Sequence, residues 1–234
     1  MYGRVINGEE FTFGVSGKLI MNARVMYDHQ TRTLWSQFLG KGVKGDLAGT
    51  KLEVLPVTQT TWVTWRELHP DTLVLDKRGR YSSDRYRSYY RDGRAGVLGE
   101  STSDGRLGRK DLVLGVDLGG SPKAYPFSIL QGQPVVNDVV AGHNALVYFD
   151  ASTGTALVYD RTVDGRPLTF RLDGEPQGIL TTLVDDETNS RWMAFTGLAV
   201  SGELNGKRLE RAFSHLSFWF AWKDWNPETE LYLG

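Results

Sequence analysis

The sequence predicts a mainly β protein made of two tandem homologous β-rich units, each of which ends in a short helix that carries tryptophan. Three observations carry this prediction: residues that repeat at a fixed spacing, short apolar strands separated by Gly, Asn and Asp turns, and two short helical segments that stop at prolines. Six of the seven tryptophans share one spacing of 157 positions, because Trp35, Trp62 and Trp65 precede Trp192, Trp219 and Trp222.

The repeat runs without a gap from residues 3–75 to residues 160–232, and 20 of these 73 pairs are identical. Unrelated sequences of ordinary composition would match at roughly one position in fifteen. The sequence therefore predicts an internal duplication. We expect a first repeat unit at residues 1–75, an Arg/Tyr-rich polar linker at 76–111 and a second, complete unit at 112–234.

The second unit begins with a series of strands that has no counterpart in the first. Strands are expected at residues 111–118, 134–140, 145–149 and 155–159, with one short helical turn started by Pro126. The counterpart positions would precede Met1. We therefore expect that the first unit lacks its N-terminal half, either because the chain is a fragment or because another segment or chain completes it.

The repeated parts share their turns. Asn7-Gly8 and Asp164-Gly165 are two-residue hairpin signals. Further along, each copy has an Asp and a Thr suited to capping a turn, and then a hairpin that ends in Gly. These paired positions are Asp28 and Thr31, Asp185 and Thr188, and the segments 47–49 and 204–206.

A short helix closes each copy. Thr60 or Thr61 is expected to cap residues 62–68, and Ser217 to cap residues 218–225. Pro70 and Pro227 should stop the two helices. The tryptophans at i and i+3 share a helical face, so we expect them to pack in the core or at its rim.

Composition excludes several classes of function. Formal net charge is −1, so no overall field attracts nucleic acid or anionic membrane. The absence of cysteine excludes disulfides, thiolate metal sites and a cysteine nucleophile. No apolar run approaches the roughly 20 residues that cross a bilayer. The N-terminus has no signal-peptide pattern, so the compartment stays open, and export of a longer precursor is possible.

The linker is rich in arginine and tyrosine, at Arg80-Tyr81, residues 85–87 and residues 89–91. One interpretation is a basic and aromatic surface for RNA or single-stranded DNA. The other is a linker whose rings pack and whose arginines are paired, and the net charge favours this one. We expect no nucleic-acid partner.

Eight strings resemble an uncharacterised prokaryotic family, the domain of unknown function 3179, and together they span most of the chain. They lie at residues 11–17 (Phe-Thr-Phe-Gly-Val-Ser-Gly), 25–28, 34–37, 47–49, 61–62, 69–72, 124–126 and 136–138. The resemblance implies a longer N-terminus that often carries a Cys-Pro-x-Cys-Gly motif. This chain has no such motif, and the resemblance brings no activity or catalytic residues to transfer.

The repeat also suggests where a site could lie, because polar residues kept by one copy alone are candidates for function. The first copy has Asn22, Ser36 and Gln37 where the second has Ile179, Met193 and Ala194. These three side chains could line a polar pocket near Trp35 or Trp62, with His69 as a further candidate. Alternatively, they only bond strand ends and turns.

Other candidate chemistry is weaker. Ser16 lacks the spacing of a nucleophile elbow. The four histidines, His29, His69, His143 and His215, have no metal spacing, and His69 fits a helix C-terminus. Asn137 and Asp138 are the best candidates in the second unit, although a strand-end Asx turn would also explain them. We expect no metal and no cofactor.

The sequence leaves two functions open. The first is a non-catalytic binding or structural module, whose partner is another protein or a second copy that completes the first unit. The alternative is an enzyme or small-ligand binder with its polar site in the first copy. Under this alternative, Ser36→Ala or Gln37→Ala should weaken ligand binding while the fold stays largely intact. Silent changes there, with loss of activity on changing Asn137 or Asp138, would place the site in the other half.

Overall fold

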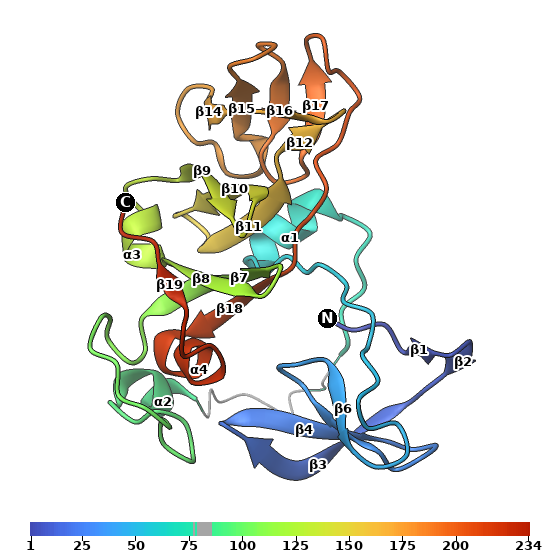
Figure 1. Cartoon of the computed structure of the whole chain (residues 1–234). Helices are drawn as coiled ribbons and strands as arrows, with labels where there is room; N and C mark the ends of the chain where they lie inside the picture. Colours follow the sequence, from blue (N-terminus) through green and yellow to red (C-terminus); the bar gives the residue numbers. More distant parts are fainter. Residues whose placement is uncertain (77, 79–85) are drawn as a thin grey trace. The chain divides into compact units, whose positions relative to one another are not determined.

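The structure, a computed structural model, describes residues 1–76, 78 and 86–234 and is mainly β (Figure 1). The fold class predicted from the sequence is confirmed in this respect. The chain packs as two compact units. Unit 1 contains Met1–Val57, Gly93–Lys110 and Phe218–Pro227, and unit 2 contains Thr58–Asp92, Asp111–Ser217 and Glu228–Gly234.

Unit 1 is built on one antiparallel sheet. A hairpin of β1 (Val5–Ile6) and β2 (Glu9–Glu10) comes first. Its turn is Asn7-Gly8, as predicted, with φ of 52° and 84°. The sheet then follows chain order, with β3 (Phe13–Ile20), β4 (Ala23–Asp28), β5 (Leu34–Ser36) and β6 (Lys41–Lys44). Helix α4 (Trp219–Trp225) belongs to the same unit.

A buried carboxylate organises this sheet. Asp28 and Trp35 are both 0% exposed, and the indole Nε1 donates to Asp28 Oδ2 at 2.8 Å. The Thr31 hydroxyl and backbone N–H donate to the same carboxylate, which confirms the predicted turn cap. Trp35 then meets Phe13 edge to face at 5.8 Å. One side chain thus fixes both the β4–β5 turn and the core tryptophan.

Helix α4 packs on this unit through aromatic rings. Phe38 stacks on Trp225 with ring centroids 4.9 Å apart and an interplanar angle of 10°, and it meets Trp222 at 6.2 Å. Stacking at such a distance adds to the apolar area that large rings bury. The helix that closes unit 1 therefore comes from the far end of the chain.

Unit 2 holds three sheets and the shorter elements around them. The first has the order β18-β7-β8-β19, the second β11-β10-β9 and the third β14-β15-β16-β17. Their strands are β7 (Leu112–Leu118), β8 (Ser121–Pro126), β9 (Val135–Val140), β10 (His143–Asp150), β11 (Thr155–Asp160), β14 (Phe170–Leu172), β15 (Thr182–Asp185), β16 (Arg191–Met193), β17 (Leu198–Ser201), β18 (Ser214–Phe218) and β19 (Glu230–Leu231). The remaining elements are α1 (Trp62–Leu68), α2 (Arg87–Arg91), α3 (Phe127–Leu130), β12 (Thr162–Val163), β13 (Arg166–Pro167) and η1 (Gly178–Leu180).

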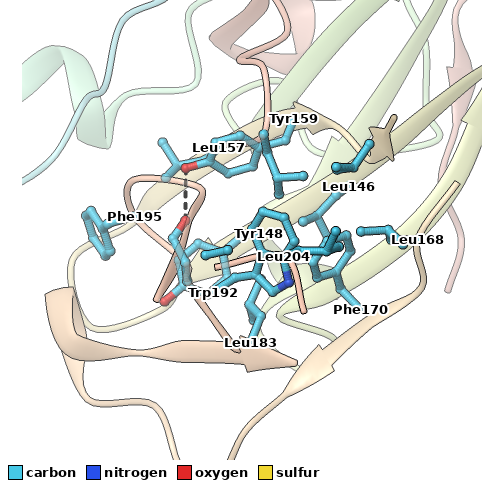
Figure 2. Packing of buried hydrophobic residues seen from close by; sticks show 14 residues of the cluster. Leu146, Tyr148, Leu157, Tyr159, Leu168, Phe170, Leu183, Trp192, Phe195 and Leu204 are labelled. Carbon is cyan, nitrogen blue, oxygen red and sulfur yellow. Dashed lines mark hydrogen bonds between the residues drawn. The ribbon is translucent and has the colours of Figure 1, made fainter. Parts of the chain in front are cut away.

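Strand β10 has a core on each face, because successive side chains of a strand point in opposite directions. Ala145, Val147 and Phe149 enter the core shared with β7, β8 and α3. Leu146 and Tyr148 enter a second core, shared with the sheet β14–β17 and with Leu68 of α1 (Figure 2). The middle sheet is therefore covered on both sides, as expected for its nearly continuous apolar sequence.

Local geometry in unit 2 matches that of unit 1 at the spacing of 157. Trp192 Nε1 donates to Asp185 Oδ2 at 2.9 Å, and Thr188 caps the same carboxylate. Trp192 meets Phe170 edge to face at 5.6 Å. These distances are close to those around Asp28. The Asp164-Gly165 turn also forms as predicted, with φ of 50° and 78°.

The ends of the helices differ partly from expectation. Thr61 caps α1, since its side chain accepts from the Thr64 N–H, as predicted. Ser217 does not cap α4, because β18 runs as far as Phe218, which becomes the N-cap residue.

The prediction that all paired tryptophans lie in the core or at its rim was also wrong at one position. Trp219 is 1% exposed, whereas Trp62 is 49% exposed.

Removal of the buried carboxylate should destabilise unit 1. In Asp28→Ala, the Trp35 indole N–H would lose its acceptor, and an unpaired buried donor costs about 1–3 kcal/mol. We expect a lower midpoint in urea unfolding followed by tryptophan fluorescence. Asp46→Ala, at an exposed position of the same unit, is the control and should change the midpoint little. Equal effects of the two changes would contradict the role assigned to Asp28.

Burial alone would raise the pKa of Asp28, but the hydrogen bonds from Trp35 and Thr31 outweigh it and lower the pKa. A lowered pKa means that this stabilisation is complete above the ordinary aspartate pKa and is lost as pH falls through the lower, folded-state value. The difference between wild type and Asp28→Ala should therefore shrink in strong acid.

Candidate functional site

The Asn22 side chain forms hydrogen bonds with the loop at residues 98–99, which belongs to the same unit. It lies in the β3–β4 turn with φ of 63°. Its amide nitrogen donates to the Gly99 carbonyl at 2.6 Å, and its amide oxygen accepts from the Leu98 N–H at 2.8 Å. A planar amide that pairs with both backbone groups imitates a β bridge. Both functions of the Asn22 side chain thus serve the chain itself.

Ser36 and Gln37 follow one another at the end of β5 but differ in burial. Ser36 is 1% exposed, and its hydroxyl accepts from the Leu39 N–H at 3.2 Å. Gln37 is exposed, and its backbone carbonyl accepts from the Tyr2 hydroxyl at 2.7 Å. These contacts tie a turn and a chain end together. The hypothesis that Asn22, Ser36 and Gln37 share one ligand site stays a prediction.

The aromatic candidates also differ from one another. Trp35 is the buried indole bonded to Asp28, as described above. Trp62 begins α1 and is half exposed. His69 is the C-cap residue of α1, its backbone N–H donates to the Trp65 carbonyl, and its ring lies 4.2 Å from that of Trp65. The predicted position of His69 at the end of the helix is confirmed.

Asn137 and Asp138 lie in the middle of β9, so the interpretation of a strand-end Asx turn was wrong. Their side chains point to opposite faces of the strand. Asn137 pairs with both backbone groups of Phe170, at 2.7 and 2.8 Å, in the same way that Asn22 pairs with its loop. Asp138 enters a polar cluster on the other face.

The Asp138 cluster joins a lysine, two tyrosines and the carboxylate. Lys123 Nζ lies 2.8 Å from Asp138 Oδ2, and the Tyr125 hydroxyl donates to the same oxygen at 2.8 Å. Burial would raise the pKa of Asp138, but these two partners hold it below its usual range. Burial and the neighbouring Asp138 raise the pKa of Tyr125. Tyr232 completes the cluster, with its ring 5.3 Å from that of Tyr125.

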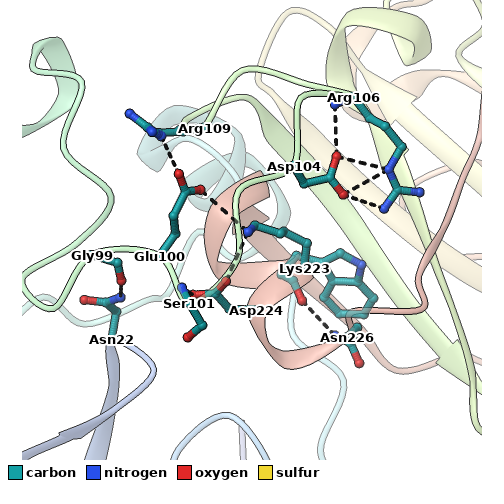
Figure 3. A network of polar contacts seen from close by, with 11 residues as sticks. Asn22, Gly99, Glu100, Ser101, Asp104, Arg106, Arg109, Lys223, Asp224 and Asn226 are labelled. Carbon is teal, nitrogen blue, oxygen red and sulfur yellow. Dashed lines mark hydrogen bonds and ion pairs between the residues drawn. The ribbon is translucent and has the colours of Figure 1, made fainter.

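A second polar network surrounds α4 in unit 1, and the sequence interpretation missed it (Figure 3). The Lys223 side chain is 3% exposed, and its Nζ lies 3.3 Å from Asp224 Oδ1 and 3.6 Å from Glu100 Oε2. The second Asp224 oxygen accepts from the Ser101 N–H at 2.9 Å. Arg109 binds Glu100 at 2.7 Å. A buried ammonium is thus neutralised by two carboxylates, as burial of a charge requires.

The loop that supplies Glu100 also covers the start of α4. The Arg106 guanidinium lies 5.0 Å from the Trp219 ring centroid, and its bond to Asp104 holds the pKa of that carboxyl below its usual value. The Phe220 N–H donates to the Arg109 carbonyl at 3.0 Å. The sequence held a signal for this network, because a base and an acid recur at the spacing of 157, at Arg66/Lys223 and Glu67/Asp224.

Residues 1–76, 78 and 86–234 contain neither a cluster suited to a metal ion nor a helix suited to a membrane span. Among them, no group of three or more His, Asp or Glu side chains could hold a metal ion. Within the same ranges, no helix combines the length and the apolar character that a membrane span needs. A hollow of about 790 Å³ lies over α2, lined by Arg87, Ser88, Arg91 and Asp92. Of the Arg/Tyr pairs in the linker, Arg80-Tyr81 and Arg85 lie outside the described residues.

Comparison with known proteins gives one match. The family model described as "Protein of unknown function (DUF3179)" matches residues 1–229. Neither the comparison with curated proteins nor that with solved structures finds a match. The family resemblance seen in the sequence strings is therefore confirmed.

His215, a residue of β18, should make the stability of unit 2 depend on pH. Burial lowers the pKa of His215 to about 4, and its ring meets that of Phe213 at 4.6 Å. Because the unfolded chain binds this proton near pH 6.5 and the folded chain does not, stability should fall by about 1–3 kcal/mol as pH drops from about 6.5 to 4.

Urea unfolding of wild type and His215→Gln over this pH range tests the assignment. We expect the free energy of unfolding to depend less steeply on pH in His215→Gln than in wild type. His29→Gln, which removes an exposed histidine, should keep the wild-type dependence. An unchanged slope in His215→Gln would assign the effect to other groups.

Proposed function

The chain belongs to the DUF3179 family of proteins of unknown function, and we propose that it acts as a non-catalytic protein-binding module. In this proposal, residues 73–75 accept an extended β-strand from another polypeptide. Recognition by strand addition draws its affinity from main-chain hydrogen bonds and its specificity from alternate side chains.

We further infer that the spacing of 157 reflects an internal duplication, with repeat units at 1–75 and 112–234 and a linker at 76–111. Matching hydrogen bonds support this inference. The Tyr2 hydroxyl donates to the Gln37 carbonyl at 2.7 Å, and the counterpart Tyr159 hydroxyl donates to the Ala194 carbonyl at 2.9 Å. The duplication makes one copy a template for interpreting the other.

One observation carries the proposed function. Leu73, Val74 and Leu75 are 95%, 67% and 80% exposed, and the described structure assigns them to no strand. Their counterparts lie in and beside β19, which pairs in parallel with β8 through Glu230↔Lys123 and Leu231↔Ala124. The Tyr232 N–H then donates to the Ala124 carbonyl at 2.9 Å. Among the described residues, no strand pairs with the corresponding position of the first copy.

The side chains indicate what the missing strand should carry. Glu230 faces Lys123, with the carboxylate 3.8 Å from Nζ, but its counterpart is Leu73. The counterpart of Tyr232, which packs on Tyr125, is Leu75. A partner strand should therefore be apolar where β8 has Lys123. Three adjacent exposed apolar side chains, which the described structure assigns to no strand, form a template for such pairing.

The proposal assigns structural roles to the polar candidates of the first copy. Asn22 bonds the backbone at residues 98–99, and Ser36 bonds that of Leu39. These bonds support a scaffold around a protein-binding surface. A side chain already bonded on both of its functions has little left to offer a ligand.

A synthetic hairpin of residues 111–127 with Lys123→Leu is the probe, since it presents the β8 edge in apolar form. We expect it to bind the intact chain in an NMR titration and to shift the amides of residues 72–76. Leu73→Asp combined with Leu75→Asp should weaken binding more than about tenfold, because burial of one Leu contributes about 1.5–3 kcal/mol.

Val97→Asp is the control, because it places one aspartate at another apolar residue, which is 84% exposed. It should bind the hairpin as wild type does. Equal binding by control and double variant, or no binding at millimolar peptide, would overturn the proposal. Self-association of the chain that disappears in the double variant would assign the strand to a second copy and would also overturn it.

A further inference from the structure

Helices α1 and α4 present the same chemistry at counterpart positions. Each begins with Trp, continues with an apolar residue, and carries a base and then an acid one turn later. In α1 these residues are Trp62, Val63, Arg66 and Glu67, and in α4 they are Trp219, Phe220, Lys223 and Asp224. Residues four apart lie next to each other on a helix, so each set forms one outward patch beside the helix start.

The two patches differ in how they are covered. Trp219 and Phe220 are 1% and 3% exposed. By contrast, Trp62 is 49% and Val63 57% exposed, and Arg66 is exposed as well. The opposite side of α1 is occupied, since Thr64 is buried and Leu68 packs on the core of unit 2. The patch on α1 is therefore the free face of an anchored helix.

In unit 1, a loop of bends and turns at residues 99–109 covers the patch on α4, and we name it the cover segment. It places one group on each feature of the patch (Figure 3). Glu100 meets the base, at 3.6 Å from Lys223 Nζ. The Ser101 N–H meets the acid, Asp224, at 2.9 Å.

Six residues after Glu100, a cation covers the aromatic ring. The Arg106 guanidinium lies 5.0 Å from the Trp219 centroid, within the range of a cation–π contact. Asp104 holds this guanidinium in place through a bond of 2.7 Å. The cover segment closes with the Arg109 carbonyl, which accepts from the Phe220 N–H at the helix start.

We propose that the patch formed by Trp62, Val63, Arg66 and Glu67 on α1 is a docking site for an extended segment of another polypeptide, with a glutamate six residues before an arginine. The glutamate binds Arg66, the next backbone N–H binds Glu67, and the arginine stacks on Trp62. The site is distinct from the strand position at residues 73–75 and rests on a different comparison.

The charges on α1 fit this occupant. Arg66 and Glu67 keep the order of Lys223 and Asp224, so an incoming segment meets base and acid in the same order. Arginine at this position also offers a bidentate fit to a carboxylate, which lysine does not. Because Trp62 and Val63 are already exposed, docking needs no displacement of the chain's own core.

The probe is a synthetic peptide of residues 98–110, which carries the cover segment sequence, added in trans to the intact chain. We expect a titration by NMR to shift the amides of residues 62–69, with weaker binding at high salt, since the pairs are exposed. Trp62→Ala should weaken binding about threefold to tenfold, as expected for loss of a cation–π contact and its apolar area. Tyr90→Ala, which removes another exposed ring, should leave it unchanged.

A charge exchange makes the test specific. Arg66→Glu should abolish binding of the natural peptide, and a peptide with Glu100→Arg should restore it. Both changes lie at exposed or synthetic positions, so folding of the chain is little affected. Binding that survives both Trp62→Ala and Arg66→Glu would overturn the proposal, as would absence of binding at millimolar peptide. Failure of the exchanged pair to restore binding would also overturn the assigned contact.

Discussion

A buried carboxylate bonded to an indole fixes the centre of two four-stranded sheets, β3–β6 and β14–β17, and much of the surrounding structure depends on it. Asp28 lies at the end of one strand and Trp35 in the next, so their bond sets the register across the turn. The buried carboxylate of Asp28 does not need water to satisfy its hydrogen bonds, because Thr31 of the same turn donates to it through its backbone N–H and its hydroxyl. The same arrangement around Asp185 and Trp192 shows that a segment of eight residues contains the carboxylate and the donors bonded to it. The hairpins that precede the two sheets form because their turn residues, Asn7-Gly8 and Asp164-Gly165, adopt positive φ.

Much of the fold could be predicted from local patterns. Turn pairs such as Asn7-Gly8 require positive φ at both positions, which few residues accept, and so they identify hairpins on their own. The Asp–Thr turns and the Thr61 cap are also local, because donor and acceptor lie within three residues. Ser217 failed as a cap because a strand runs directly into α4, and nothing within the helix sequence reveals that.

The sites were harder to predict because they depend on pairings that are distant in sequence. In the sequence, Asn22 and Asn137 are polar residues without an evident role. In the structure, each side chain bonds to a backbone partner, which lies 76 or 77 positions away for Asn22 and 33 positions away for Asn137. Trp219 is buried and meets Arg106 of a cover segment whose sequence has no strong pattern of its own, whereas Trp62 is half exposed. The informative signal was that a base and an acid recur at Arg66/Lys223 and Glu67/Asp224. The helical periodicity of these residues alone predicts only an ordinary solvent-exposed face.

The composition of the two packing units has a consequence for how the chain can be divided. Unit 1 takes its closing helix from Phe218–Pro227, and unit 2 takes α1 from within Thr58–Asp92. A fragment that starts at residue 112 would therefore keep α4 but lose Phe38, the ring on which Trp225 stacks. A fragment that ends at residue 75 would keep α1 but lose the core on which Leu68 packs. We therefore expect neither half to fold fully by itself, and the two halves produced as separate polypeptides should acquire their structure only by associating.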